Sequence, residues 1–355
     1  MTKEIFAPTK EDKWLLASHM QKAIRRGLDE EAAWAAGHLH TVDRSYLAYR
    51  LSVIAVEDVA AGDLSSTAAF VGDVPWGAKR FGTSRDEPER ERWQETSRAM
   101  ARQRKDRTPC DWIACRYWLD EFEKQEGPWA QLDPFSCIEE AENKNYSWWK
   151  RGLFAWRAAG TDRFPADQLP TVVGAWDDWV ASNANKDLQT VMMGLGARQR
   201  EPHPVFLPLA VMDRKSDPSA KTVDYKVDSV KHDHWLSAAI DGHTKPGISA
   251  AHQFVRSLSP QALADLSSHR ASPVAMTRRM MFWMEGGHID KGWEYTTQKN
   301  ITEDTRKRWL NEINAGNGSM IIKHLAHPKR WYKFREIALQ DDLNKKRTDT
   351  KSMKI

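Results

Sequence analysis

Long apolar runs and cysteines are both scarce in this 355-residue chain. No stretch approaches the roughly 18 consecutive apolar residues of a membrane-spanning helix, and no apolar signal segment stands at the N-terminus. The three cysteines Cys110, Cys115 and Cys137 form no CxxC pair, which argues against a disulfide framework and against a zinc site built on thiolates. We therefore expect a cytoplasmic protein without a membrane partner.

The common catalytic signatures are also missing. The chain contains no GxxxxGK[ST], GxGxxG, GxSxG or HExxH and no kinase signature set. Their absence excludes a standard ATP-hydrolysing P-loop module, most nicotinamide chemistry, the common serine hydrolases and a helical zinc protease. We therefore expect a protein that is not an enzyme and that holds no cofactor or metal.

Charge and aromatic content leave the choice of partner open. Lys plus Arg exceeds Asp plus Glu only by 53 to 49, so any argument for nucleic acid has to come from local patches. The 17 tryptophans favour helical bundles held by large buried rings. The alternative is that some of these rings stack on bases.

Helical periodicity dominates the chain and is clearest over residues 45–63. Leu47, Leu51, Ile54 and Ala55 follow one another at i, i+4, i+7 and i+8, which predicts one buried helical face. Glu57 and Asp58 come next, where we expect a solvated helix end with the two acids pairing with Arg44 or Arg50. The predicted fold class is mainly α, built from helical-bundle modules.

A chain of this length is long enough for more than one core. Changes in composition divide it into a helical domain at 1–127, an aromatic-rich helical connection at 128–200 and a second helical domain at 201–340. The basic residues 341–355 are expected to be disordered.

Two clusters of basic residues and one separate lysine are candidate nucleic-acid contacts, because cations bind phosphates and interleaved aromatic rings stack on bases. Lys22, Arg25 and Arg26 form a further basic row, for which a solvated helix end is favoured over a phosphate patch. Lys245 stands where Thr244 and Pro246 predict the start of a helix. The candidate residues are Arg102, Arg104, Lys105 and Arg107; Lys245; and Lys329, Arg330, Trp331, Lys333 and Arg335.

Histidines gather between residues 232 and 252 and give an enzymatic alternative. His234, Asp241 and His243 are the candidate catalytic residues there, because imidazole and carboxylate groups act as acids, bases and metal ligands. This alternative is an enzyme that acts on DNA or nucleotides.

The sequence of residues 11–63 resembles the helical region that follows the ATPase core in the MgsA/RarA/WRNIP family of clamp-loader-like AAA+ proteins, which act at stalled replication forks. In that family a K-S-I-R-G helix and an alanine-rich helix precede a Y-I-A-R-R-L-x-x-I-A-x-E-D-I-G-x-A-D run. Tyr49 departs from the pattern at the first arginine, Ala60 replaces the glycine after the acids, and the ATPase core is absent. The resemblance covers residues from about 11 to 120. The matching positions are Lys22, Ala23, Ile24, Arg25, Arg26 and Gly27; Asp29, Ala32 and Ala33; and Tyr46, Leu47, Ala48, Arg50, Leu51, Ile54, Ala55, Glu57, Asp58, Val59 and Asp63.

This resemblance implies a helical fold like a clamp-loader collar or AAA+ lid, which in the family mediates oligomerisation and relates to DNA-associated work. It carries over no catalytic residue. We therefore expect a non-enzymatic accessory protein of DNA replication or recombination. Its expected partner is single-stranded or forked DNA or a replication protein, and a homo-oligomer is compatible with this function. A protein of this kind would suit the genome of a bacteriophage or a mobile element. The alternatives are the enzyme named above and a protein-binding inhibitor of a host factor.

Overall fold

The chain is mainly helical, which confirms the predicted fold class. The computed structural model describes residues 8–59, 61–73, 90–126, 132–159, 170–183, 187–188, 191, 203–267, 272–281, 287–314 and 328–352. Within these ranges two small antiparallel sheets, each of two strands, accompany the helices. No described helix combines the length and the apolar character that crossing a membrane requires.

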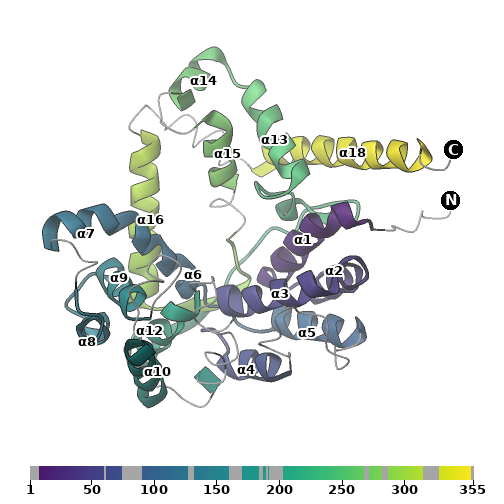
Figure 1. The fold of residues 1–355 in the computed structure, drawn as a ribbon. Coiled ribbons are helices and arrows are strands. Elements are labelled where there is room, and N and C mark those ends of the chain that lie inside the picture. Colours follow the sequence, from purple (N-terminus) through teal and green to yellow (C-terminus); the bar gives the residue numbers. More distant parts are fainter. Residues whose placement is uncertain are drawn as a thin grey trace.

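Figure 1 shows two groups of helices with a third, looser group above them. One group holds α1 (Lys13–Arg25), α2 (Asp29–Val42), α3 (Arg44–Ile54), α4 (Leu64–Asp73) and α5 (Arg90–Arg102). The other holds α6 (Thr108–Trp112), α7 (Leu119–Glu126), α8 (Ser136–Glu142), α9 (Trp148–Ala159), α10 (Pro170–Asn183), α12 (His203–Ser216) and α16 (Thr296–Asn314). The third group holds α13 (Lys245–Arg256), α14 (Pro260–Ser267), α15 (Pro273–Met281) and α18 (Pro328–Ser352).

Short strands tie distant parts of the chain together. β1 (Lys221–Asp224) pairs with β4 (Lys291–Glu294), and β2 (Lys231–His232) pairs with β3 (Trp235–Leu236). A parallel bridge joins Lys105 to Gly292 and so attaches the link between α5 and α6 to β4. The β1–β4 pairing and the bridge attach residues 221–224 and the α5–α6 link to the strand that precedes α16.

The first core is built on the helical face that the sequence predicts. Leu47, Leu51, Ile54 and Ala55 are all fully buried, as their spacing requires. They pack with residues of α1, α2 and α5, and also with Trp235 and with Leu339 of α18. The N-terminal helices therefore share one core with two segments from the far end of the chain.

The second core is aromatic, and it contains several of the tryptophans for which the bundle interpretation was favoured. Trp112, Trp176 and Phe206 are almost fully buried in it, and the Trp112 ring stacks on Phe206 with centroids 6.2 Å apart. The indole N–H of Trp112 donates a 2.8 Å hydrogen bond to the carbonyl of Trp148. Indole N–H groups in protein cores usually find such an acceptor.

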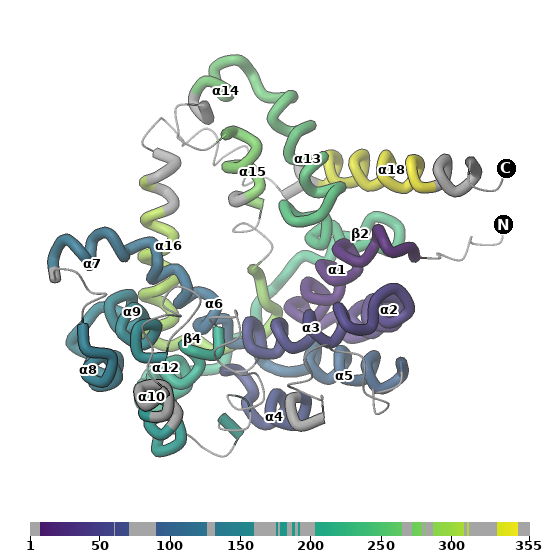
Figure 2. The backbone as a smooth tube through the Cα atoms, viewed as in Figure 1, coloured from purple at the N-terminus to yellow at the C-terminus, as the bar shows by residue number. Residues whose placement is uncertain are grey.

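The two cores draw on residues from both sides of the predicted boundaries at 127 and 200. The aromatic core joins residues 112–122 to residues 137–211 and to Ile301, and the first core joins residues 15–101 to residues 235–240 and 339. Helix α18, which runs beside α13 in Figures 1 and 2, continues to Ser352. It therefore extends into the tail for which the composition predicts disorder.

Gly27 ends α1 with φ of 67°, a left-handed conformation that costs an L side chain free energy. A Cβ at this position would also lie 2.1 Å from Oδ2 of Asp290. Gly27→Ala is therefore expected to lower the free energy of unfolding by about 1–2 kcal/mol, measured by urea denaturation. Gly37→Ala in α2 is the control, because a Cβ there meets only the ends of the Gln94 and Arg90 side chains. An equal loss in both variants would contradict the explanation.

Candidate functional site

The acids that close the α3 segment lie inside the protein. Residues Ala55–Val59 form a π-helical turn directly after α3, a local distortion that is frequent at functional sites. Asp58 is fully buried and Glu57 is 13% exposed at its side chain. The expectation of a solvated helix end is therefore wrong.

Two arginines bind these acids. Nε of Arg25 and Nε of Arg107 donate to the same oxygen of Asp58, at 2.7 and 3.0 Å, and Nη2 of Arg25 donates to Glu57 at 2.7 Å. We call Arg25, Glu57, Asp58 and Arg107 the polar centre. Ions this deeply buried persist only when they are paired and hydrogen-bonded.

The pairing differs from the predicted one. Arg50 donates to Gln21 at 2.8 Å rather than to either acid, and Gln21 in turn donates to Glu57 at 2.9 Å. Burial alone would raise the pKa of Glu57, but the positive charges of Arg25, His203, Arg107 and Arg50 together lower it. Glu57 is thus held as a carboxylate.

The basic row at the end of α1 is also internal. Lys22, Arg25 and Arg26 are each no more than 5% exposed, which overturns both the solvated helix end and the phosphate patch. Lys22 binds Asp241 at 2.7 Å, and Arg26 donates to the carbonyl of Asp228 at 3.2 Å. These cations join α1 to the second half of the chain.

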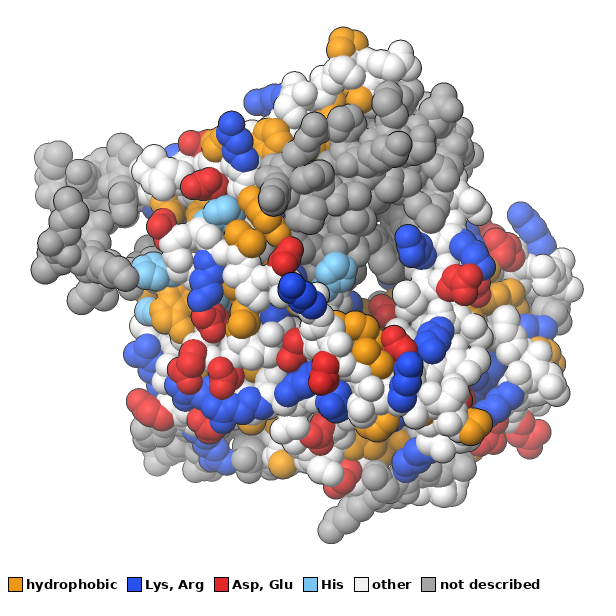
Figure 3. All heavy atoms as spheres, turned by 180° about the vertical axis from the view of Figure 1, so that it is seen from behind, with side chains coloured by type: hydrophobic (Ala, Val, Ile, Leu, Met, Phe, Trp, Pro, Cys, Tyr) orange, Lys and Arg blue, Asp and Glu red, His pale blue; other side chains and the backbone are white. Residues whose placement is uncertain are grey.

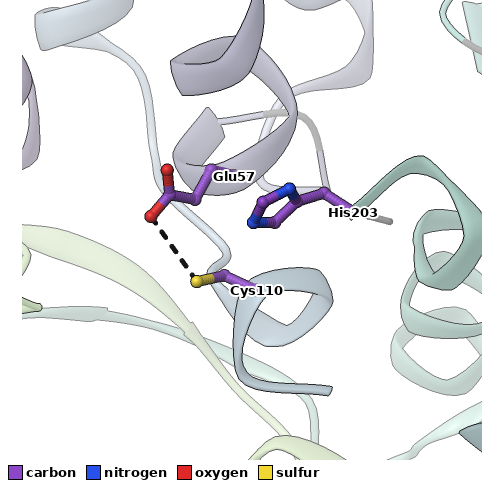
Figure 4. A group of neighbouring side chains, drawn as sticks. All are labelled: Glu57, Cys110 and His203. Atoms are coloured by element: carbon purple, nitrogen blue, oxygen red, sulfur yellow. Dashed lines mark hydrogen bonds between the residues drawn. The ribbon is translucent and has the colours of Figure 1, made fainter. Parts of the chain in front are cut away.

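Cys110 and His203 adjoin the polar centre. Figure 4 shows Glu57, Cys110 and His203 turned toward one another from three separate segments. One ligand atom from each of the three lies within 4.8 Å of the others, and Sγ of Cys110 is 3.5 Å from Glu57 Oε1. Nη2 of Arg107 lies 3.1 Å from the same sulfur. Among the residues that the structure describes, this is the group of three side chains suited to hold a metal ion.

A cleft of about 640 Å³ opens beside the polar centre. Arg107, Thr108 and Asp111 are among the residues that line it, so the segment that carries Cys110 contributes to its wall. Burial raises the pKa of Asp111, although the charge of Arg107 opposes this. The lining also includes Tyr225, Lys226, Trp293 and residues of α16.

Part of the basic cluster in residues 102–107 is internal. Lys105 is fully buried, with its Nζ 2.7 Å from Asp290 and 2.6 Å from the carbonyl of Ala101, and burial lowers its pKa to about 8 against the effect of Asp290. Arg107 is committed to Asp58. Neither of these two residues is a surface phosphate contact, contrary to the prediction.

The other two members of that cluster are more accessible but paired. The Arg102 side chain is 55% exposed and binds Asp29 at 2.8 Å. The Arg104 side chain is 34% exposed and binds Asp224 at 3.0 Å. On the face drawn in Figure 3, basic and acidic side chains alternate in the same way.

The C-terminal candidates are divided. Arg335 is 1% exposed and lies 3.3 Å from Oγ of Ser237, so it is not a surface contact, whereas Lys333 is exposed. The side chains of Lys329, Arg330 and Trp331 lie outside the described residues. Lys245 begins α13 behind the Thr244 cap, as predicted, and its side chain is 71% exposed, 3.6 Å from Glu11.

The histidine-rich segment does not form the predicted catalytic group. Asp241 is buried and accepts from Lys22, from Oγ of Ser18 at 3.1 Å and from the backbone N–H of His243 at 2.9 Å. The ring of His234 stacks on Trp34, and the His243 side chain is exposed. The carboxylate therefore serves the buried ion pair and is not available as a base.

No motif in the sequence indicates the Glu57, Cys110 and His203 group. The sulfur of Cys110 and the carboxylate of Glu57 are 53 residues apart along the chain, and His203 stands in a proline-rich segment with no motif spacing. Only the RxxC sequence from Arg107 to Cys110 could have indicated a thiol beside a cation.

Comparison of the chain with protein-family models, with curated proteins and with solved structures finds no match.

Proposed function

We propose that this chain is a non-enzymatic helical accessory protein of DNA replication or recombination, and that the cleft binds the backbone and bases of single-stranded or forked DNA. The observation that carries the proposal is the set of side chains that the cleft brings together. Lys226 and Arg306 are exposed at the cleft, and neither makes an ion pair with any residue that the structure describes. Unpaired cations of this kind are suited to phosphates.

An aromatic side chain accompanies these cations. Tyr225 is 38% exposed and lies in the same cleft, with its hydroxyl 3.3 Å from Glu294. Trp293 is less available, because the Arg214 guanidinium covers its ring at 4.6 Å. The cleft also contains the acids Glu294 and Glu303, but cations beside an accessible ring are the usual arrangement for binding single strands without sequence preference.

The family resemblance supports the same function independently of the cleft. Its first motif supplies Arg25 and its last motif supplies Glu57 and Asp58, and these residues make one buried network. Residues of the two resembling stretches therefore contact each other in the folded chain. In the proposal this network stabilises a collar-like helical region, and members of the resembled family act at stalled replication forks.

Removing the two cleft cations is expected to weaken DNA binding in a salt-dependent way. Each lost phosphate contact lowers the slope of log affinity against log salt by about 0.7 for a single strand, so Lys226→Ala/Arg306→Ala should reduce the slope by about 1.4. Tyr225→Ala should cost about 1–3 kcal/mol of binding free energy. Fluorescence anisotropy with labelled single-stranded and forked oligonucleotides over a salt series measures both effects.

The matched control is Lys10→Ala/Arg256→Ala, which removes the same charge from exposed positions that do not line the cleft. The control should keep the wild-type slope. An equal decrease in slope would indicate a diffuse charge effect and contradict binding in the cleft. Absence of salt-dependent binding by the wild-type chain would overturn the proposed function and favour the protein-binding alternative.

A further inference from the structure

The Glu57, Cys110 and His203 group brings together a carboxylate, a thiol and an imidazole. They come from the π-helical turn, from α6 and from the start of α12, so only the tertiary fold assembles them. The combination of sulfur, nitrogen and oxygen donors is typical of zinc, a borderline-soft cation, and differs from the all-oxygen sets that magnesium and calcium prefer.

We propose that Glu57, Cys110 and His203 bind one zinc ion and leave its fourth coordination position open to water or a ligand. Three protein ligands leave the ion able to bind water or an added ligand, whereas structural zinc sites are closed by four protein ligands. This inference does not depend on DNA binding in the cleft.

The surrounding groups already hold two of the three ligands in place. Arg25 and Gln21 fix the Glu57 carboxylate through bonds of 2.7 and 2.9 Å. Nη2 of Arg107 lies 3.1 Å from Sγ of Cys110, where it would stabilise a thiolate. Neighbouring groups that orient metal ligands in this way raise metal affinity.

Two arginines close to a cation site would oppose metal binding if they were not neutralised. Asp58 binds both of them and Glu57 binds Arg25, so these two acids offset the two guanidinium charges. Cys110, bound as a thiolate, then adds a further negative charge toward the divalent ion. The two arginines therefore do not exclude Zn²⁺ from the site.

The remaining cysteines provide internal controls. Cys115 and Cys137 are 0% and 1% exposed within the aromatic core, and burial raises the pKa of Cys137 to about 12. Thiols in such surroundings stay protonated at neutral pH and are poor metal ligands. Cys110 is thus the thiol expected to coordinate metal.

The test is metal titration of the full-length, untagged, reduced chain after treatment with a chelator. Zinc competed against a chromogenic chelator should give one tight site per chain. Cobalt in its place should give thiolate-to-cobalt charge-transfer absorption. Cys110→Ser should abolish that absorption and weaken zinc binding by more than about 100-fold, because the loss of a neighbouring hydrogen-bonding group alone costs up to that factor. His203→Ala should weaken zinc binding by a similar factor.

Cys137→Ala and the exposed His243→Ala are the matched controls and should retain the wild-type stoichiometry and spectrum. Zinc binding that survives Cys110→Ser, or that is lost equally in Cys137→Ala, would overturn the assignment. Circular dichroism shows whether each variant folds. If Cys110→Ser does not fold, the wild-type cobalt spectrum decides, because a spectrum without thiolate absorption overturns the proposal.

Discussion

Asp58→Ala is expected to lower the free energy of unfolding by about 3–5 kcal/mol, the usual cost of removing one partner from a buried ion pair. Asp58 is fully buried, and one of its oxygens accepts from both Arg25 and Arg107. Its removal leaves two buried guanidinium groups with Glu57 as their remaining acid in the polar centre. Chemical denaturation followed by tryptophan fluorescence measures the loss.

The control for Asp58 is Glu30→Ala, which breaks an ion pair of similar length on the surface. Glu30 binds Arg98 at 3.0 Å with a side chain that is 69% exposed, and such pairs contribute at most about 1 kcal/mol. A loss of less than about 1 kcal/mol in Asp58→Ala would contradict the stabilising role of the polar centre.

Asp241→Asn is expected to destabilise the protein by about 3–5 kcal/mol at neutral pH, and this difference should decrease as the pH falls below about 4. Lys22 and Asp241 are each 3% exposed at their side chains and lie 2.7 Å apart. The substitution leaves the Lys22 ammonium buried with an amide as its neighbour. Lys22 belongs to α1 and Asp241 precedes α13. The substitution therefore weakens an ion pair that joins these two distant parts of the chain.

The pH dependence follows from the pKa of Asp241. Burial alone would raise this pKa, but the charge of Lys22, its hydrogen bond and the N–H of His243 lower it below the usual value. The folded carboxyl therefore binds its proton less readily than the unfolded one. Its stabilising contribution is present above about pH 4, the ordinary pKa of aspartate, and is lost as the pH falls through the folded pKa.

Urea denaturation of the wild-type protein and Asp241→Asn between pH 7 and pH 3 measures this convergence. Asp224→Asn is the control, because Asp224 binds Arg104 at 3.0 Å with a side chain that is 77% exposed. That variant should stay close to the wild type throughout. A constant difference between Asp241→Asn and the wild type down to pH 3 would contradict the linkage.

Clusters of basic residues in the sequence did not reliably predict which side chains lie on the surface. Arg107 and Arg335 were both predicted to contact nucleic acid, yet Arg107 neutralises Asp58 and Arg335 is buried near Ser237. A cation pattern in one segment does not reveal an acid that the fold supplies from another segment. Lys226 and Arg306 of the cleft, which are exposed and make no ion pair with a described residue, were not among the predicted contacts.

What the sequence determined by itself is the local structure. The spacing of Leu47, Leu51 and Ile54 predicted a buried face because helical periodicity depends only on neighbouring residues. The mainly helical fold class followed from the same periodicity.

Tertiary structure alone decided which charges meet. Glu57, Cys110 and His203 approach one another because the π-helical turn after α3 packs with α6 and α12, and Lys22 meets Asp241 across 219 positions of the chain. These contacts depend on how helices pack around two cores, which the pattern within any one helix does not specify. The polar centre, the cleft and the proposed zinc site are for that reason properties of the folded chain.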